Sequence, residues 1–300
     1  MEIAAKIEKM VHGGFGLSRT EKGIVFVSGG LPGETVRATM DNSVGGQAHA
    51  SVLEILEPSP FRREPKCPHW KACGGCDWLH VLYKEQVSMK LGIFQECLQR
   101  IGKISILPSI DVFESKEFGY RRRAQFKLDR AKNTAGFFKM RSSEIVPVLK
   151  CQILNAQLNE LLAVLPRHAS ALLKHVVQVK AIAEETSENA EDSPRKAVPK
   201  DIATSPEILG VTKGSIQISV DSKRFVVDGN SFFQSNQFLA GAMGSWAEDK
   251  VGGETFWDLY SGTGFFSVFL GKKFKTGFAV DNEPSHAIAA RKNLDMNGVV

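Results

Sequence analysis

Apolar and polar residues alternate in short blocks whose lengths predict a mixed α/β chain. Near the C-terminus, the apolar run 256–260 predicts a buried strand, the turn 261–264 holds two glycines, and the apolar run 265–270 is typical of a helix start. A second apolar strand is predicted over 276–280, and Asp281 follows it. A glycine turn between strand and helix lets the backbone approach a ligand and directs unpaired N–H groups at it. The pattern therefore predicts a nucleotide-type site.

The first part of the chain predicts a small β-barrel over residues 1–58. Short apolar runs separated by glycine turns fill this region, and four or five strands of this length are typical of small barrels. Prolines 58, 60 and 65 then mark a linker. We expect two further domains, a central one over 59–230 and a third over 231–300.

The central domain is predicted to mix helices and strands. Apolar residues at helical spacing predict helices over 87–101 and 152–165, and a strand is predicted over 117–128 with partner strands over 135–139 and 144–149.

A polar segment interrupts the central domain. Residues 184–206 contain few apolar side chains and three prolines, which predicts a disordered insertion. The strand-like runs 176–182 and 215–220 flank this insertion, and we expect them to pair across it. After them, Gln234 and Asn236 precede a predicted helix, where capping of the helix is the simplest role.

The glycine turn favours one nucleotide cofactor over another. The third glycine of the dinucleotide fingerprint is missing after Gly264, which argues against NAD. Asp258 stands four residues before Gly262 and suits the amino-acid end of S-adenosylmethionine. Asp281 lies 17 residues past Gly264, near the spacing at which an acid binds ribose hydroxyls.

Composition describes an ordinary globular protein with one basic region. Hydrophobic residues make up 43% and charged residues 24%, and no run approaches the length of a membrane span or forms a signal peptide. We therefore expect a cytoplasmic protein with no membrane association. The net charge is only +5, but residues 116–141 hold nine Lys or Arg against two acids, which predicts a phosphate-binding face or a solvated strand.

The basic strand has two unlike faces. Arg122, Ala124, Phe126 and Leu128 share one face, which is expected to pack inside the protein. On the other face, the candidates for RNA phosphate binding are Arg121, Arg123 and Lys127.

The cysteines predict a metal site. Three of them are grouped with C-x5-C-x2-C spacing, at positions 67, 73 and 76. A fourth ligand is needed, and we assign Cys151 rather than Cys97, which lies on the apolar face of a predicted helix. The spacing leaves zinc open, with His69 and His80 as further ligands, but a single C-x2-C pair favours a [4Fe–4S] cluster.

Several motifs occur together and in a fixed order. They are Gly14-Phe15-Gly16 with Leu31-Pro32-Gly33-Glu34-Thr35-Val36, the cysteine motif with distant Cys151, Gly119-Tyr120-Arg121-Arg122-Arg123-Ala124, Phe233-Gln234-x-Asn236, and Asp258-Leu259-Tyr260-Ser261-Gly262-x-Gly264. In this combination the chain resembles the bacterial 23S rRNA (uracil-5-)-methyltransferases, within the family of RNA 5-methyluridine methyltransferases.

The resemblance implies a fold, cofactors and partners. It implies a TRAM barrel, a central cluster-bearing α+β domain, and the start of a Rossmann-like methyltransferase domain. A structural [4Fe–4S] cluster would bind Cys67, Cys73, Cys76 and Cys151. Gln234, Tyr260 and Asp281 match cofactor-contacting positions, while Ser261 and Phe265 depart from the family pattern. The implied partner is RNA, ribosomal before transfer RNA, bound by a monomer.

The resemblance also implies what is missing. Family members methylate C5 of uracil after a cysteine thiolate adds to C6, and the target base must be unstacked. That cysteine and its general base lie in later strands than those of this sequence, so we expect a C-terminally truncated chain that is inactive alone. The alternatives are a tRNA uracil-5-methyltransferase and a non-catalytic RNA-binding protein with a structural metal.

Overall fold

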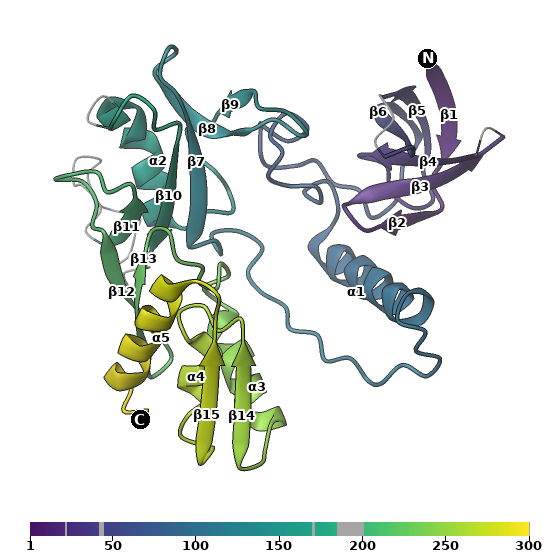
Figure 1. The fold of residues 1–300 in the computed structure, drawn as a ribbon. Coiled ribbons are helices and arrows are strands. Elements are labelled where there is room, and N and C mark those ends of the chain that lie inside the picture. The colour runs from purple at the N-terminus through teal and green to yellow at the C-terminus, as the bar shows by residue number, and fades with distance from the viewer. Residues whose placement is uncertain (22, 42–44, 170–171, 185–200, 300) are drawn as a thin grey trace. The chain divides into compact units, whose positions relative to one another are not determined.

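The protein forms two compact units. The computed structural model describes residues 1–299 except 22, 42–44, 170–171 and 185–200 (Figure 1). One unit comprises Met1–Glu114 with Lys139–Ser142, and the other comprises Ser115–Phe138 with Ser143–Val300. None of the helices in the described residues is both long and apolar enough to cross a membrane.

The first unit is built on a six-stranded sheet of order β1-β5-β6-β4-β3-β2. The strands are β1 (Glu2–Lys6), β2 (Lys9–Val11), β3 (Phe15–Thr20), β4 (Gly23–Ser28), β5 (Thr35–Met40) and β6 (Ala48–Glu57). β1 pairs with β5 at one edge and β2 pairs with β3 at the other. Only Ile7 and Glu8 separate β1 from β2, so one bent stretch of chain supplies both edge strands of the sheet.

A buried ion pair fastens the barrel to the segment that follows it. Glu34 is fully buried, and its Oε1 lies 2.6 Å from Nε of Arg62. Oε2 of the same carboxylate accepts a hydrogen bond from the backbone N–H of Leu31 at 2.8 Å. A buried carboxylate persists only when it is paired in this way, which explains the acid in the Leu31–Val36 motif.

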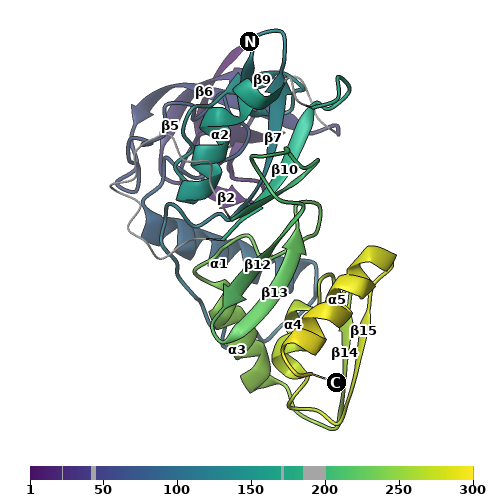
Figure 2. The same ribbon diagram turned by 90° about the vertical axis from the view of Figure 1, so that its left-hand side faces the viewer.

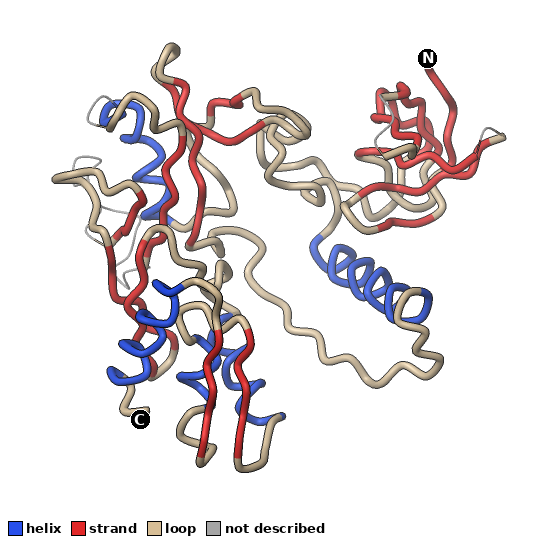
Figure 3. Tube along the Cα trace, in the orientation of Figure 1, coloured by secondary structure: helices blue, strands red, loops and turns tan. Residues whose placement is uncertain are grey.

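After the cysteine-rich loop, α1 (Tyr83–Arg100) confirms the first predicted helix. Residues 101–122 then contain neither helix nor strand, and they connect the two units (Figure 3). The strand predicted over 117–128 therefore begins later, at Arg123. Gly119 adopts a positive φ of 66°, and Arg121 makes only isolated bridges, to Leu154 and Asn236.

The second unit begins with a five-stranded sheet of order β11-β10-β7-β8-β9, covered by α2 (Ala156–His168) (Figure 1). Its strands are β7 (Arg123–Asp129), β8 (Thr134–Phe138), β9 (Ile145–Pro147), β10 (Gln178–Ala183) and β11 (Ile202–Ser205). Arg122, Ala124, Phe126 and Leu128 are buried, as the alternation of the basic strand predicts.

Two predictions about the polar segment are wrong. Its last part, which was expected to be disordered up to residue 206, contains the ordered strand β11 paired with β10. The runs 176–182 and 215–220 do not pair with each other, because β12 (Ser215–Val220) pairs with β13 (Lys223–Asp228) through the turn Asp221-Ser222. Asp221 has a positive φ of 50°, which suits a tight hairpin. Residues 185–200 of the predicted insertion lie outside the described residues.

The C-terminal part alternates helices and parallel strands. It contains α3 (Ala240–Lys250), β14 (Thr255–Leu259), α4 (Phe265–Leu270), β15 (Thr276–Val280) and α5 (Pro284–Met296). β14 and β15 pair in parallel, and α3 and α4 lie to one side of them (Figure 2). A core that includes Phe225, Phe233, Phe265 and Phe269 joins α4 to the β12–β13 hairpin. On β14 and β15 themselves, Trp257 and Phe278 stack on each other yet stay exposed.

Candidate functional site

The glycine turn lies at the carboxyl ends of the two parallel strands. The Ser261 N–H donates to the carbonyl of Val280 at 3.0 Å, and the Gly262 N–H donates to Oδ2 of Asp281 at 2.8 Å. Gly262 and Gly264 have positive φ angles of 54° and 79°, which other residues adopt at a cost. The structure therefore brings together the predicted turn and the predicted acid, at the position where α/β sheets bind nucleotides.

Asp281 is held in its charged form by the turn around it. Oδ1 accepts hydrogen bonds from the Glu283 N–H and from Nδ1 of His286, both at 3.0 Å. The Glu283 N–H above all, and then the Gly262 N–H and His286, lower the pKa of Asp281 below its ordinary value. A carboxylate offers about four acceptor positions, and these three bonds leave one on Oδ2 for a hydroxyl.

Asp258 stabilises the start of α4. Its Oδ2 accepts hydrogen bonds from the Ser267 N–H at 3.0 Å and from the Ser267 hydroxyl at 2.6 Å. A carboxylate at a helix N-terminus satisfies unpaired N–H groups and interacts favourably with the helix dipole. Asp258 thus acts on the shape of the turn through α4.

Tyr260 and Gln234 occupy different settings. Tyr260 is 87% exposed and has a positive φ of 62°, so a non-glycine residue stands in a disfavoured conformation next to the turn. Gln234 is half-buried between β13 and α3. Its neighbour Asn236 accepts from the Phe238 and Leu239 N–H groups at 3.0 and 3.3 Å in the turn before α3, but the N-cap residue of α3 is Leu239 and has no side-chain hydrogen bond, so the predicted helix-capping role for Asn236 is wrong.

A residue that the sequence did not single out supports the turn from behind. Asn293 of α5 is fully buried, and its Nδ2 donates to the carbonyl of Thr263 at 2.9 Å. Its Oδ1 accepts from the Val226 N–H on β13 at 2.7 Å. The only signal in the sequence is a polar residue one position before Leu294 and three after Ala290, on the inward face of α5.

The predicted RNA-binding face of β7 is partly engaged within the protein. Arg123 donates from Nε to the carbonyl of Ser231 at 3.1 Å, and burial lowers its pKa. Lys127 donates to Oε1 of Gln178 at 2.6 Å and lies over the ring of Phe138, 4.5 Å from its centroid. Arg121 is half-buried and donates to the carbonyl of Arg123 at 3.0 Å.

The four predicted metal ligands fall in both units. Cys67, Cys73 and Cys76 belong to the first unit and Cys151 to the second. No group of three or more His, Cys, Asp or Glu side chains converges on a metal-sized space among the described residues. Burial raises the pKa of Cys73, and its sulfur accepts a hydrogen bond from the Gly75 N–H. Thiols supported by backbone N–H groups are donors that suit an iron–sulfur cluster.

Cys151 has a support that the sequence did not reveal. The side chain of Asn159 on α2 accepts from the Cys151 N–H at 2.8 Å and donates to its carbonyl at 3.0 Å. Cys97 is half-buried on α1 rather than enclosed in a core.

His80, one of the candidate zinc ligands, is fully buried, and neither ring nitrogen has a hydrogen-bond partner in the described part of the chain. Its ring packs against Trp70 with the ring centroids 4.8 Å apart.

Comparisons with known proteins agree on an RNA-modifying fold. No protein-family model matches the chain. It is 30% identical to an uncharacterised RNA methyltransferase of Aquifex aeolicus over 97% of this chain and 74% of that protein. It is 28% identical to the 23S rRNA (uracil(1939)-C(5))-methyltransferase RlmD of Vibrio parahaemolyticus, over 99% of this chain and 73% of that protein.

A solved structure has the same fold. The tRNA (uracil-54, C5)-methyltransferase of Pyrococcus abyssi, in complex with S-adenosyl-L-homocysteine, superposes with a TM-score of 0.67 at 19% identity. The match covers 99% of this chain and 78% of the solved one.

Proposed function

The chain belongs to the family of RNA methyltransferases that includes the 23S rRNA (uracil-C5)-methyltransferases, and from this membership we propose that it serves the methylation of C5 of a uridine in RNA with S-adenosylmethionine as methyl donor. The observation that carries the proposal is the Gly262–Asp281 turn at the carboxyl ends of β14 and β15. Its half-buried Gly262 backbone and its charged acid suit a nucleoside ligand.

The turn residues divide the work of donor binding. Gly262 has open space where a side chain would stand, so a ligand can approach its backbone, whereas Gly264 lets Ala290 of α5 pack against the turn. Asp281 accepts a ribose hydroxyl on its remaining Oδ2 position. Asp258 keeps the start of α4 in place. Gln234 and Tyr260 flank the ligand in this proposal. The bound donor supplies an electrophilic methyl group on a sulfonium.

A binding measurement tests this site. Asp281→Asn keeps the shape of the side chain but removes its charge, so we expect affinity for S-adenosylmethionine to fall about tenfold by calorimetry, as for loss of a charge-assisted hydrogen bond. Asp295→Asn on the exposed face of α5 should leave affinity unchanged. Equal affinity for the wild type and Asp281→Asn would remove Asp281 from the donor site.

We propose that the chemistry follows the covalent route of the family. A cysteine thiolate adds to C6 of uracil, C5 then takes the methyl group, a base removes the C5 proton, and the thiolate is eliminated. None of the five cysteines of this chain is assigned to that step, since four are proposed cluster ligands and Cys97 lies on α1.

We further propose a structural [4Fe–4S] cluster on Cys67, Cys73, Cys76 and Cys151, with zinc as the alternative metal. Protein purified without oxygen should contain about four iron atoms and as many sulfides per chain. Cys73→Ser should lose both, whereas Cys97→Ser should keep them. If the wild-type protein is colourless and contains bound zinc, the site is a zinc site and the cluster assignment is wrong.

Ribosomal RNA is the substrate that the relatives favour, because several curated relatives are named as methyltransferases of 23S rRNA. Mass spectrometry should find one 5-methyluridine missing from the 23S rRNA of a strain that lacks the gene. Loss of 5-methyluridine from tRNA instead would identify a tRNA enzyme, and no loss in either RNA would contradict the proposed activity.

A further inference from the structure

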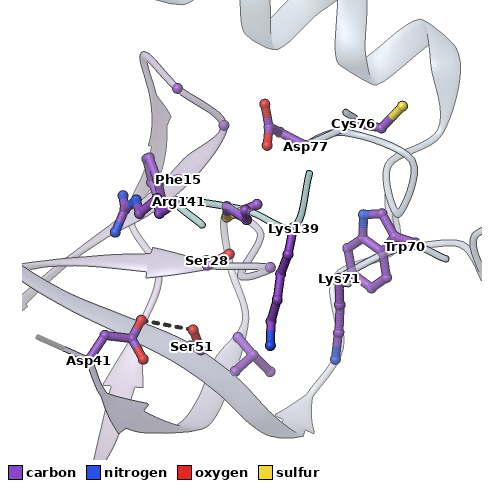
Figure 4. A pocket seen from close by; sticks show the side chains of 15 residues that line it. Phe15, Ser28, Asp41, Ser51, Trp70, Lys71, Cys76, Asp77, Lys139 and Arg141 are labelled. Atoms are coloured by element: carbon purple, nitrogen blue, oxygen red, sulfur yellow. Dashed lines mark hydrogen bonds between the residues drawn. The ribbon is translucent and has the colours of Figure 1, made fainter. Parts of the chain in front are cut away.

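The first unit contains a cleft of about 610 Å³ that the proposed methyl-transfer site does not use. Three parts of the chain line it: the strand ends and turns of the barrel, the cysteine-rich loop, and residues 139–141 (Figure 4). The antiparallel bridge between Cys73 and Lys139 joins the last two parts. The volume is in the range of small-ligand sites in proteins.

Trp70 gives the cleft a fixed aromatic surface. Its indole packs against the fully buried ring of His80, which leaves Trp70 little freedom to turn. The ammonium of Lys71 lies over the same indole, 5.3 Å from its centroid. Lys71 is exposed, so a flat ligand can replace this ammonium at the ring for about 0.5–1 kcal/mol of lost cation–π energy.

Positive charge predominates in the cleft. Lys71, Lys139 and Arg141 line it together with two acids, Asp41 and Asp77. The side chains of Lys71 and Lys139 extend in the same direction across it (Figure 4). Asp41 accepts a hydrogen bond from Ser51 at 2.8 Å.

Arg141 is fixed in position by the barrel. Its guanidinium lies 5.0 Å from the ring centroid of Phe15, and its Nη2 is 3.3 Å from Nδ1 of His49. Arg141 and Lys71 both have positive φ angles, 54° and 73°. Two cationic residues of one cleft are thus held in a conformation that costs on the order of 1 kcal/mol each, and such strain concentrates at ligand sites.

We infer that this cleft binds one nucleotide of single-stranded RNA, with the base stacked on Trp70 and the neighbouring phosphates bound by Lys71, Lys139 and Arg141. An aromatic platform beside cations is how proteins hold unpaired nucleotides without reading their sequence. The inference rests on the proposed function, because it takes RNA as the substrate, and it adds a second contact with that RNA outside the donor site.

Substitution of Trp70 tests the stacking. With a single-stranded RNA of about ten nucleotides, Trp70→Ala should raise Kd about 5- to 100-fold, the range for loss of one base–aromatic stack. Trp70→Phe should stay within about threefold, because it keeps a ring. The control is Trp246→Ala, a partly exposed tryptophan on α3, which should not change Kd.

Fluorescence separates stacking from a merely structural role. RNA should quench wild-type tryptophan emission, and Trp70→Phe should lose most of that quenching while it still binds RNA. Full quenching in Trp70→Phe, or wild-type affinity in a folded Trp70→Ala, would overturn the inference. Thermal unfolding of each variant checks that it is folded, and Trp70→Phe carries the test if Trp70→Ala is not.

Salt dependence tests the phosphate contacts. Lys139→Gln and Lys71→Gln should each reduce the slope of log K against log salt concentration by about 0.7, whereas exposed Lys272→Gln or Lys275→Gln should not. Unchanged slopes would show that Lys71 and Lys139 do not contact the RNA phosphates. The outcomes are distinct from failure of the proposed function: a strain without the gene that keeps all its 5-methyluridine contradicts the activity, whereas wild-type RNA binding with no effect at Trp70 contradicts only the cleft.

Discussion

At the scale of single residues, His80 makes the stability of the protein depend on pH. Burial, followed by the nearby charges of Arg62, Lys71 and Arg63, lowers its pKa to about 3. In the unfolded chain the imidazole takes up a proton below its ordinary pKa of about 6.5, whereas the folded protein excludes that proton. The free energy of unfolding that His80 contributes is therefore fully present above about pH 6.5, and it is lost as the pH falls toward about 3.

Replacement of His80 by phenylalanine should remove this dependence. Between about pH 6.5 and pH 5 the wild type should lose on the order of 2 kcal/mol of unfolding free energy through His80, and His80→Phe should not. Because neither ring nitrogen has a partner among the described residues, the variant should be as stable as the wild type or more so near neutral pH. Denaturant titrations at the two pH values measure both effects, and equal pH dependence would contradict the burial of a neutral imidazole.

Asn293 should affect both stability and donor binding. Asn293→Leu removes the acceptor of the Val226 N–H and the donor to Thr263, so we expect a loss of about 1–3 kcal/mol and weaker binding of S-adenosylmethionine. Asn297→Ala breaks similar but solvent-exposed bonds to the backbone of Arg224 and should cost less than about 1 kcal/mol. Thermal unfolding and calorimetry measure the two quantities, and unchanged donor affinity in Asn293→Leu would mean that the turn keeps its shape without this amide.

At the scale of elements, Gly244 of α3 and Gly92 of α1 allow the effect of helix propensity on stability to be compared with the effect of packing. Alanine favours a helix over glycine by about 1 kcal/mol. A Cβ at Gly244 of α3 would lie 2.5 Å from the buried ring of Phe269 on α4, and overpacking of a core costs about 1–3 kcal/mol. A Cβ at Gly92 of α1 would meet nothing within 4 Å.

Gly244→Ala should therefore lower the melting temperature, and Gly92→Ala should raise it slightly. Scanning calorimetry of both variants measures these melting temperatures. A Gly244→Ala protein more stable than the wild type would show that α3 and α4 can move apart at little cost.

Elements were predictable where local pattern determines them, and pairing was not. The apolar runs 265–270 and 276–280 coincide with α4 and β15, because continuous apolar residues favour a short regular element, although only α4 is buried and every residue of β15 is exposed. By contrast, the partner of 215–220 depends on the turn Asp221-Ser222, and β11 forms in a polar stretch because β10 offers it a paired edge. Propensity carries no information on which edges are available.

In the candidate site too, local sequence predicts some features and only the folded structure reveals others. Gly262, Gly264 and Asp281 were predictable because their chemistry is tied to a fixed spacing in the chain. Asn293 and Asn159 were not, because each acts on backbone groups brought near only by folding. The spacing of Asp258 indicated a cofactor contact, whereas its hydrogen bonds run to Ser267.

At the scale of the whole molecule, an apolar surface remains open on the β14–β15 sheet. Trp257 is 62% exposed and Phe278 43%, and the neighbouring Leu259 and Val280 are also exposed. Both strands of a parallel sheet normally carry cover on each face, and exposed apolar surface of this kind promotes association.

Loss of the exposed indole of Trp257 should make the protein less prone to self-association. Trp257→Thr should lower both the binding of a hydrophobic dye and light scattering at high protein concentration. Phe113→Ser, at an exposed phenylalanine in the irregular segment 101–122, serves as the control and should change neither. Equal dye binding by Trp257→Thr and the wild type would show that the dye binds to another surface of the protein.

The Gly262–Asp281 contact also bears on how the proposed reaction ends. In the proposed reaction the ribose hydroxyl is the same before and after the methyl group leaves, so its proposed bond to Asp281 would stabilise donor, transition state and demethylated product alike. Such uniform binding raises occupancy without raising the rate of the chemical step. The demethylated product should therefore compete with the donor for the turn, and turnover should depend on how fast that product is released or consumed.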